Sequence, residues 1–561
     1  MSNGAAVIAR SLYNLGVRHV FGIVGIPVIE VAEACIAQGI RFIAFRNEQA
    51  ATYAASAYGY LTGKPGVCLV VGGPGVVHAL AGAENASANG FPVLLLAGSA
   101  ESHQRAKGAF QELNQVAAVQ QYTKLAVQPA SVGHVTSLME KAYRHAYFGR
   151  PGCTYLDLPA DIIQGKAQGD HDPSSSVIDP GPAPRSMADP TRIRAAVEAL
   201  TAAKRPLLIV GKGAAYGKCE HAVRALHNRT QIPFLPTPMG KGVLPDDSPL
   251  NMSAARSAAL RAADVILLLG ARLNWILHYG EAPKFDPEVK IVQVDMHAEE
   301  LGNNAGSAQL GVAGDIGLVA EQLMEQLPAS YRAPPIPQTV AETRAKNTAK
   351  ASKAEHGTEV PIKYQPTYRV IRETLAQVAG DRNIVYVSEG ANTMDISRTA
   401  FPLNAPRNRL DAGTNATMGV GLGYAIAAKI AQPNDLVVAI EGDSAFGFSA
   451  IEVETAVRSK LPMVIYVMNN SGVYHGVDPS AYDNQDQKPL PPTALQLDTK
   501  YHALAESLGA KGYLATTLEE VQSATADAVR SNSVAIINVI IDSGKDKKLE
   551  FGWMASTKPK L

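Results

Sequence analysis

The segment from residue 436 to residue 472 decides the fold, because it combines two apolar strands with two polar turns. It reads LVVAIEGDS at 436–444 and MVIYVMNNSG at 463–472, and a helix is predicted between them from about Ala450 to Arg458. Short apolar runs that alternate with helices are typical of neighbouring strands in a parallel sheet. Both polar turns then lie at the carboxyl edge of one sheet, where open α/β sheets bind their ligands.

The two turns supply oxygen ligands for a metal ion. The first turn offers a carboxylate, and the second offers an amide oxygen and a free backbone carbonyl. Hard oxygen donors suit Mg²⁺ that holds a diphosphate. Either turn alone is better explained as an ordinary turn sequence. The two together, at this spacing, predict a metal and diphosphate site.

The rest of the chain divides into three blocks of alternating strands and helices. Two linkers separate them, one crowded with Asp, Ser and Pro, and one that opens Pro-rich and turns into an Ala/Lys/Glu segment. The alternation predicts an α/β protein with three parallel-sheet domains. The predicted boundaries are domains at 1–165, 191–327 and 367–542, linkers at 166–190 and 328–366, and a C-terminal tail at 543–561.

The first and third blocks resemble each other when the sequence is shifted by 370 positions. The shift places Val67, Gly72, Glu84, Ala86 and Pro92 on Val437, Gly442, Glu454, Ala456 and Pro462. Chance matches occur in an Ala/Gly-rich chain, but the shared order of elements favours a duplicated α/β unit. Two similar sheets usually imply a site between them.

Composition excludes several classes of protein. The 561 residues hold 51 basic and 51 acidic side chains, so the positive field of a nucleic-acid binder is missing. The four cysteines form no CxxC pair, which argues against a zinc site or a disulfide framework. The N-terminus lacks a secretory signal, and the glycines at 72–75 interrupt the longest uncharged stretch. We expect a soluble protein without a membrane span.

The spacing of the two polar turns resembles that of the thiamine-diphosphate (ThDP) enzymes. In that family a Gly-Asp-x motif is followed by an Asn-Asn pair, and here Asp443 and Asn470 are 27 residues apart. The resemblance implies ThDP and Mg²⁺ as cofactors and pyrimidine-binding, central Rossmann-like and diphosphate-binding domains. The implied metal ligands are Asp443, Asn470 and the carbonyl of Gly472. The implied cofactor contacts in this domain are Asn392, Ala416, Met418, Ser444, Asn470, Val473 and Tyr474.

Three of these positions carry further detail. The family commonly has Gly where this chain has Ser444 and Ala416, so the local geometry around Ala416 is less certain. A bulky apolar residue at Met418 bends the cofactor in the family, although it is also suited to plain core packing. In the 370-residue shift Met418 falls on Glu48, which predicts matching helices for the two residues.

Glu48 is the predicted acid beside the pyrimidine ring of the cofactor. It follows the predicted strand Phe42 to Phe45 at the start of a small-residue helix. Desolvation in an apolar site would raise its pKa so that it shares a proton with the ring. The alternative is a glutamate that only favours the helix dipole from the first turn.

Four further segments narrow the resemblance to the 2-hydroxyacyl-CoA lyases. They are residues 21–28, 46–49, 108–112 and 388–395. Oxalyl-CoA decarboxylases are near relatives that typically carry Tyr-Glu at the position of Phe110-Gln111. A Phe beside a neutral Gln is the better wall for an aliphatic chain. The leading prediction is a lyase that splits the C1–C2 bond of 2-hydroxyacyl-CoA through a ThDP-bound carbanion, giving formyl-CoA and an aldehyde one carbon shorter.

Two other functions stay open, as does the base for the substrate hydroxyl. The alternatives are an oxalyl-CoA decarboxylase, which shares the motifs, and a non-catalytic nucleotide-binding protein, which the presence of Glu48 ranks last. Phe110, Gln111 and His78 join Glu48 as predicted catalytic residues. The base for the 2-hydroxyl is the cofactor imine, His78 or His475, and a lone histidine is commonly a structural hydrogen-bonder.

The middle block and the tail give weaker predictions. The family uses this domain for FAD or ADP, and an ADP site and a structural vestige stay equally open; the candidate ADP residues are Arg150, Lys212, Arg272, Asp295 and Asp315. The tail begins at Lys545 and contains Phe551, Trp553 and Met554. In the oxalyl-CoA relatives a tail of this kind folds over bound CoA.

The end of the chain and the shared site suggest partners. Pro559-Lys560-Leu561 resembles a peroxisomal address read by an import receptor, which suits α-oxidation of fatty acyl-CoA; otherwise a cytoplasmic location is expected. We also expect an acyl-CoA thioester substrate, no nucleic acid, and a homodimer or homotetramer that shares its sites between subunits.

Overall fold

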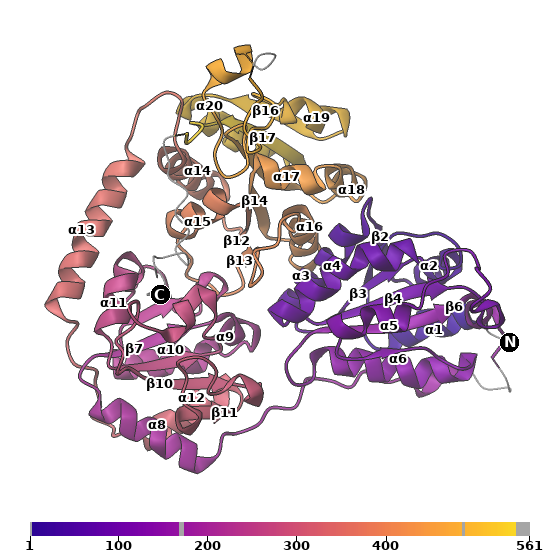
Figure 1. Cartoon of the computed structure of the whole chain (residues 1–561), viewed down its shortest axis with the longest axis horizontal. Coiled ribbons are helices and arrows are strands. Elements are labelled where there is room, and N and C mark those ends of the chain that lie inside the picture. Colours follow the sequence, from indigo (N-terminus) through magenta and orange to yellow (C-terminus); the bar gives the residue numbers. More distant parts are fainter. Residues whose placement is uncertain (1–2, 168–172, 485–487, 546–561) are drawn as a thin grey trace.

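The computed structural model describes residues 3–167, 173–484 and 488–545 (Figure 1). Within the described residues three sheets follow one another along the chain. All paired strands in these sheets are parallel. The prediction of an α/β protein with three parallel sheets is confirmed. No helix within the described ranges combines the length and apolar character needed to cross a membrane.

The first sheet has six strands in the order β2-β1-β3-β4-β6-β5. The strands are β1 (His19–Gly22), β2 (Arg41–Ala44), β3 (Gly66–Val70), β4 (Val93–Ser99), β5 (Ala126–Val127) and β6 (Cys153–Pro159). Successive side chains of the buried strands point to opposite faces, so each face has its own core. One face is covered by α1 (Gly4–Asn14), α2 (Ile29–Ala37), α6 (Val132–Tyr147) and α7 (Ala160–Gln164), the other by α3 (Glu48–Thr62), α4 (Pro74–Asn89) and α5 (Gln115–Val119).

The third sheet repeats the topology of the first, with the order β13-β12-β14-β15-β17-β16. Its strands are β12 (Ile384–Glu389), β13 (Arg409–Asp411), β14 (Leu436–Gly442), β15 (Met463–Asn469), β16 (Lys511–Ala515) and β17 (Val534–Ile540). β4 and β15 are 370 residues apart at both ends. The same strand order in both sheets supports the predicted duplication.

The helices of the third sheet connect it to the first. One face carries α14 (Tyr364–Val378) and α20 (Leu518–Ser531), and the other carries α16 (Gly421–Ala431), α17 (Asp443–Ser449), α18 (Glu452–Arg458) and α19 (Tyr501–Ser507). Figure 1 shows α3 and α16 side by side at the junction, and their buried residues belong to one continuous core. The approach is close, because a Cβ added at Gly423 would lie 2.7 Å from the carbonyl oxygen of Ala50. A residue without a side chain is needed there.

The central sheet has the order β11-β10-β9-β7-β8. Its strands are β7 (Pro206–Val210), β8 (Phe234–Pro236), β9 (Val265–Leu269), β10 (Lys290–Asp295) and β11 (Gly311–Ala313). Its faces are covered by α8 (Pro190–Ala202), α9 (Lys212–Tyr216), α10 (Glu220–Thr230) and α12 (Ile316–Gln326), and by α11 (Arg256–Ala262) and α13 (Gln338–Glu355). The predicted linker 328–366 therefore contains a helix, α13, whose Val340 is buried in the central core.

Two helix boundaries differ from the sequence prediction. The helix expected from Ala450 to Arg458 is α18, which begins two residues later at Glu452, and a further short helix, α17, lies before it from Asp443 to Ser449. Met418 was expected on a helix matching that of Glu48, but it lies three residues before α16. The backbone at Gly419 has φ +90° and its N–H is directed at a buried carboxylate, so the helix begins only at Gly421.

Candidate active site

The two polar turns of the third sheet meet, as the sequence predicted. Asp443 is the first residue of α17 at the end of β14, and Asn470 follows β15. The backbone N–H of Gly472 donates to Oδ2 of Asp443 at 3.1 Å and to Oδ1 of Asn470 at 3.2 Å. Ser444 donates its backbone N–H to Oδ1 of Asp443 at 2.9 Å. All the predicted metal ligands thus form one cluster, which we call the Asp443 cluster.

Asn392 joins this cluster from the helix that follows a third strand. It lies in the first turn of α15 (Ala391–Ala400), just after β12, and its Nδ2 donates to the carbonyl of Tyr474 at 2.8 Å. Asn470 donates to the same carbonyl at 3.4 Å. Ser471 and Tyr474 have φ values of +55° and +71°, which non-glycine residues rarely adopt. The hydrogen bonds hold this strained loop in place, as is common at ligand sites.

The Asp443 cluster fits a divalent cation. Asp443 is only 2% exposed. Burial raises the pKa of its carboxyl group to about 7, although the backbone N–H groups that donate to it act in the opposite direction. A bound cation would offset this desolvation. In the described part of the chain no group of three or more His, Cys, Asp or Glu side chains is arranged for a metal. The mixed carboxylate, amide and carbonyl set is instead the kind that Mg²⁺ accepts.

Glu48 and His78 form a second cluster in the first domain. Asn47 is the N-cap of α3 and accepts the backbone N–H of Gln49 at 2.7 Å, so Glu48 opens the helix. Oε2 of Glu48 lies 3.1 Å from Nδ1 of His78 on α4. The side chain of Glu48 is 13% exposed and that of His78 is 59% exposed. The sequence treated the two residues as separate candidates, and the structure brings them together.

The loop with Phe110 and Gln111 packs against the same turn that leads to His78. A Cβ added at Gly73 would lie 2.7 Å from the carbonyl oxygen of Gln111, and Gln111 itself has φ +55°. The buried amide of Gln115 accepts the N–H of Gly73 at 2.7 Å and donates to the carbonyl of Gly98 at 2.9 Å. Phe110 remains 74% exposed. The fixed loop therefore presents an apolar ring to solvent.

The turn that carries Ala416 and Met418 rests on buried carboxyl groups. Glu389 accepts the backbone N–H groups of Gly419 and Gly421, the latter at 2.6 Å. Burial raises the pKa of Glu389 to about 7. Its neighbour across the paired strands is Glu441, which is also fully buried, and burial together with the charge of Glu389 raises the pKa of Glu441 well above its usual value. Ala416 adopts φ +50°, so this turn is strained as well.

Sequence reasoning missed four buried polar residues near these loops. Gln115, Glu389 and Glu452 accept backbone N–H groups, whereas both carboxyl oxygens of Glu441 are buried without a hydrogen-bond partner among the described residues. A glutamate within an apolar strand, such as Glu441 at the end of LVVAIE, was the available signal, since such residues are almost never buried without a reason. For Gln115 and Glu452 no sequence signal was available, because both occupy ordinary polar positions of helices.

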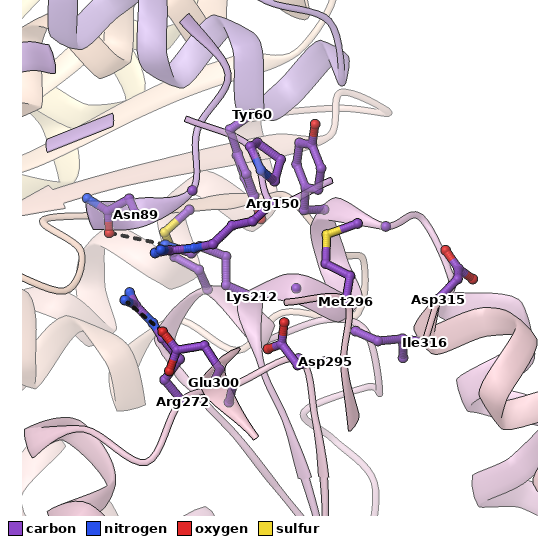
Figure 2. A pocket seen from close by; sticks show the side chains of 18 of the residues that line it. Tyr60, Asn89, Arg150, Lys212, Arg272, Asp295, Met296, Glu300, Asp315 and Ile316 are labelled. Atoms are coloured by element: carbon purple, nitrogen blue, oxygen red, sulfur yellow. Dashed lines mark hydrogen bonds and ion pairs between the residues drawn. The ribbon is translucent and has the colours of Figure 1, made fainter. Parts of the chain in front are cut away.

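The five candidate nucleotide residues line one cavity of about 650 Å³ between the first and central domains. In Figure 2 Arg150, Lys212 and Arg272 gather at one end, whereas Asp295 and Asp315 lie further along. Lys212 Nζ donates to Oδ1 of Asn89 at 3.1 Å. Burial, followed by the charges of Arg272 and Arg150, lowers the pKa of Lys212 well below its usual value. Basic side chains outnumber acidic ones at this end, where Oε1 of Glu300 lies 4.0 Å from Nη1 of Arg272, so this end of the cavity is electropositive.

Three family models match successive parts of the chain. The model described as "Thiamine pyrophosphate enzyme, N-terminal TPP binding domain" matches residues 2–118, the central-domain model residues 193–323, and the "C-terminal TPP binding domain" model residues 389–539. The chain belongs to the thiamine pyrophosphate enzyme family. The Glu48 and Asp443 clusters lie in its two TPP-binding domains, TPP being another name for ThDP. The predicted family resemblance is confirmed.

Curated relatives extend the match over nearly the whole chain. The chain is 44% identical to 2-hydroxyacyl-CoA lyase 1 of Mus musculus, covering 98% of the chain and 96% of the relative. It is 43% identical to the 2-hydroxyacyl-CoA lyase of Saccharomyces cerevisiae, covering 99% and 98%. Oxalyl-CoA decarboxylase of Escherichia coli (strain K12) is 36% identical, covering 100% and 98%. The relatives are thus the ones that the sequence predicted, with 2-hydroxyacyl-CoA lyases more similar to the chain than the oxalyl-CoA decarboxylase.

Proposed function

We propose that this thiamine pyrophosphate enzyme is a Mg²⁺-dependent 2-hydroxyacyl-CoA lyase that releases formyl-CoA and an aldehyde one carbon shorter. The observation that carries the proposal is the full-length similarity to lyases in a chain with Phe110-Gln111 beside the Glu48 cluster. The alternative is oxalyl-CoA decarboxylation, which the more distant relative represents.

The side chains divide the work between the two clusters. Asp443, Asn470 and the carbonyl of Gly472 would hold Mg²⁺ and the diphosphate, with Ser444 and Val473 beside it. Asn392 and Tyr474 shape the loop around them. Bound ThDP supplies an electron sink for the bond that breaks next to the thioester carbonyl. Met418, with the carbonyl of Ala416, would set the conformation of the bound cofactor.

The Glu48 cluster would handle protons and the substrate. Glu48 would share a proton with the pyrimidine ring. His78 would take the proton of the 2-hydroxyl and exchange it with Glu48, a role supported by its exposed ring and by the 3.1 Å between its Nδ1 and Oε2 of Glu48. His475, whose Nδ1 lies 3.0 Å from the carbonyl of Gly476, is the other candidate. Phe110 would contact the acyl chain, and Gln111 would leave the site uncharged beside it.

A substrate comparison tests the function. The purified protein is supplied with ThDP, Mg²⁺ and either a 2-hydroxyacyl-CoA or oxalyl-CoA, and formyl-CoA is quantified. We expect kcat/KM for the 2-hydroxyacyl-CoA to exceed that for oxalyl-CoA by at least tenfold, with equimolar aldehyde. The reverse preference would assign the chain to the decarboxylases, and no turnover of either thioester would contradict the proposal.

The electropositive end of the central cavity supports a further proposal, that the cavity binds ADP. Two arginines and a half-buried lysine gather at this end, where Glu300 is the acidic partner of Arg272, and a polyanion would offset the remaining positive charge. Lys212→Met should raise the Kd for ADP at least tenfold in calorimetry without lowering the melting temperature of the ADP-free protein, because its removal lessens the repulsion among the three cations. Lys204→Met, outside the cavity, serves as the control. Unmeasurable ADP binding by the unaltered protein would favour the structural vestige.

The separation of the two clusters supports a shared site. In the described part of the chain no hydrogen bond or ion pair joins Glu48 to Asp443, although both belong to TPP-binding domains. Exposed apolar side chains surround both clusters, including Val77 and Phe110 at one and Phe448 and Val473 at the other. We therefore propose a homodimer or homotetramer in which the Glu48 cluster of one subunit meets the Asp443 cluster of another.

The C-terminal tail at 543–561, which carries the predicted cover for CoA and the peroxisomal address, lies outside the described residues apart from 543–545. A peroxisomal location with an import receptor as partner remains a proposal based on Pro559-Lys560-Leu561. A fluorescent fusion that keeps these three residues at its end should enter peroxisomes, and deletion of the three should leave it in the cytoplasm. An unchanged distribution would contradict the address.

A further inference from the structure

The backbone that leads into Glu48 is held by a buried carboxyl from the third domain of the same chain. Glu452, in the first turn of α18, is fully buried. Its Oε1 and Oε2 lie 3.1 and 3.3 Å from the backbone nitrogen of Arg46. The backbone N–H of Asn47 lies close enough to stabilise the charged carboxyl, and the hydroxyl of Thr455 donates to Oε2 at 2.6 Å. Glu452 thus holds the backbone of Arg46 and lies beside that of Asn47.

The contacts around Glu452 are more exposed. Arg46 Nη1 lies 3.4 Å from Oε2 of Glu454, and these two side chains are 51% and 26% exposed. Arg458 Nη2 donates to the carbonyl of Ala44 at 2.6 Å. A solvent-exposed ion pair such as Arg46–Glu454 contributes little to stability. Hydrogen bonds to a charged group in a buried setting are stronger, so Glu452 is the main anchor.

The anchored residues fix the direction of the first turn of α3. Asn47 uses its side chain to cap Gln49 and its backbone N–H to reach Glu452, so it connects the helix to the third domain. From Ala50 onward, α3 is packed against α16. The carboxyl of Glu48 lies between these two attachments. Displacement of a reacting group by about 1 Å can cost about 100-fold in rate.

We propose that Glu452 is a positioning residue, whose buried carboxyl holds the backbone of Arg46 and Asn47 so that Glu48 meets the pyrimidine ring of ThDP. The meeting with the ring rests on the proposed function, whereas the hold on the backbone does not. Glu452→Ala removes the acceptor. Glu452→Gln keeps one acceptor oxygen. Glu454→Gln, two residues along the same helix, removes the exposed ion pairs with Arg46 and Arg458 and is the matched control.

Two exchange measurements on the full chain test the proposal. The first follows amide hydrogen exchange at residues 46 and 47 in protein without ThDP, and the second follows deuterium exchange at the thiazolium C2 of bound ThDP. We expect both amides to be protected in the unaltered protein. In Glu452→Ala we expect amide exchange at least tenfold faster and C2 exchange at least tenfold slower, with the Kd for ThDP within threefold. Glu452→Gln should return both rates to within fivefold, and Glu454→Gln to within twofold, of the unaltered protein.

Several results would overturn the proposal. If residues 46 and 47 of the unaltered protein exchange as fast as an unstructured peptide, Glu452 does not hold them, and no variant has to fold for this conclusion. Normal exchange rates in folded Glu452→Ala would also overturn it. Failure of the proposed function is distinguishable, since it would appear as normal C2 exchange without turnover of either CoA thioester.

Discussion

Glu48 is the residue to which the proposed function assigns the proton exchange with the cofactor. Its side chain is mostly buried at the start of α3, and His78 is the exposed group beside it. The pair therefore combines a sheltered carboxyl with a route to solvent. Removing the carboxyl while keeping its shape tests this arrangement directly.

Glu48→Gln should lower kcat at least 100-fold, which is the lower range of acid–base contributions. The Kd for ThDP should change less than threefold, because the proposed function assigns the metal and diphosphate to Asp443 and its neighbours. Stopped assays of formyl-CoA and calorimetry with ThDP measure the two quantities. Glu140→Gln, which removes only a surface pair with Arg144, is the control. Undiminished kcat in Glu48→Gln would contradict the assignment.

The raised pKa of Glu452 predicts how the unfolding free energy depends on pH. Burial raises its pKa to about 7 in the folded protein, above its ordinary value of 4.5. The folded state then binds the proton more tightly than the unfolded state, so this group lowers stability as pH rises from about 4.5 to about 7. In Glu452→Gln the decline in unfolding free energy over this range should shrink by up to about 1.4 kcal/mol per pH unit. Urea denaturation at several pH values measures the slope, and an unchanged slope would contradict the raised pKa.

At the scale of elements, the sequence predicts the strands well and the loops that hold the site less well. Strands such as Val265–Leu269 are found at their predicted bounds, because a strand buried on both faces must be a continuous apolar run. The oxygen donors at 443 and 470 were found because they directly follow such runs. The supporting residues Gln115 and Glu452 were missed, because their partners are backbone groups far away in the chain that only the fold brings close.

The contact between α3 and α16 carries a prediction of its own. Gly423→Ala would normally gain about 1 kcal/mol of helix propensity. Here the new Cβ meets the backbone oxygen of Ala50 at 2.7 Å, and neither backbone can move without separating the two domains. We expect a net loss of about 1–3 kcal/mol in unfolding free energy by urea denaturation. Gly133→Ala on α6, where the nearest atom is 4.0 Å away, should be neutral or stabilising. Equal effects in the two variants would contradict the close packing.

At the scale of the whole molecule, the two sheets of equal strand order each carry one of the two clusters. The same strand order in the first and third sheets places one cluster on each copy. Within the described residues the two copies contact each other through α3, α16 and α18, and this contact leaves Glu48 and Asp443 without a direct link. A second copy of the chain, arranged antiparallel, would complete two sites at once.

Mixed dimers separate a shared site from two independent ones. Glu48→Gln and Asp443→Asn should each be nearly inactive, the first for want of the acid and the second for want of the metal ligand. If sites are shared, a heterodimer purified through two different tags has one site with both changes and one site with neither. It should therefore recover about half the formyl-CoA production of the unaltered dimer. If each chain forms its own site, both sites of the heterodimer carry one change and activity stays at the level of the parents. A heterodimer of unaltered and Glu48→Gln chains should have about half activity under either arrangement and controls for the exchange of subunits.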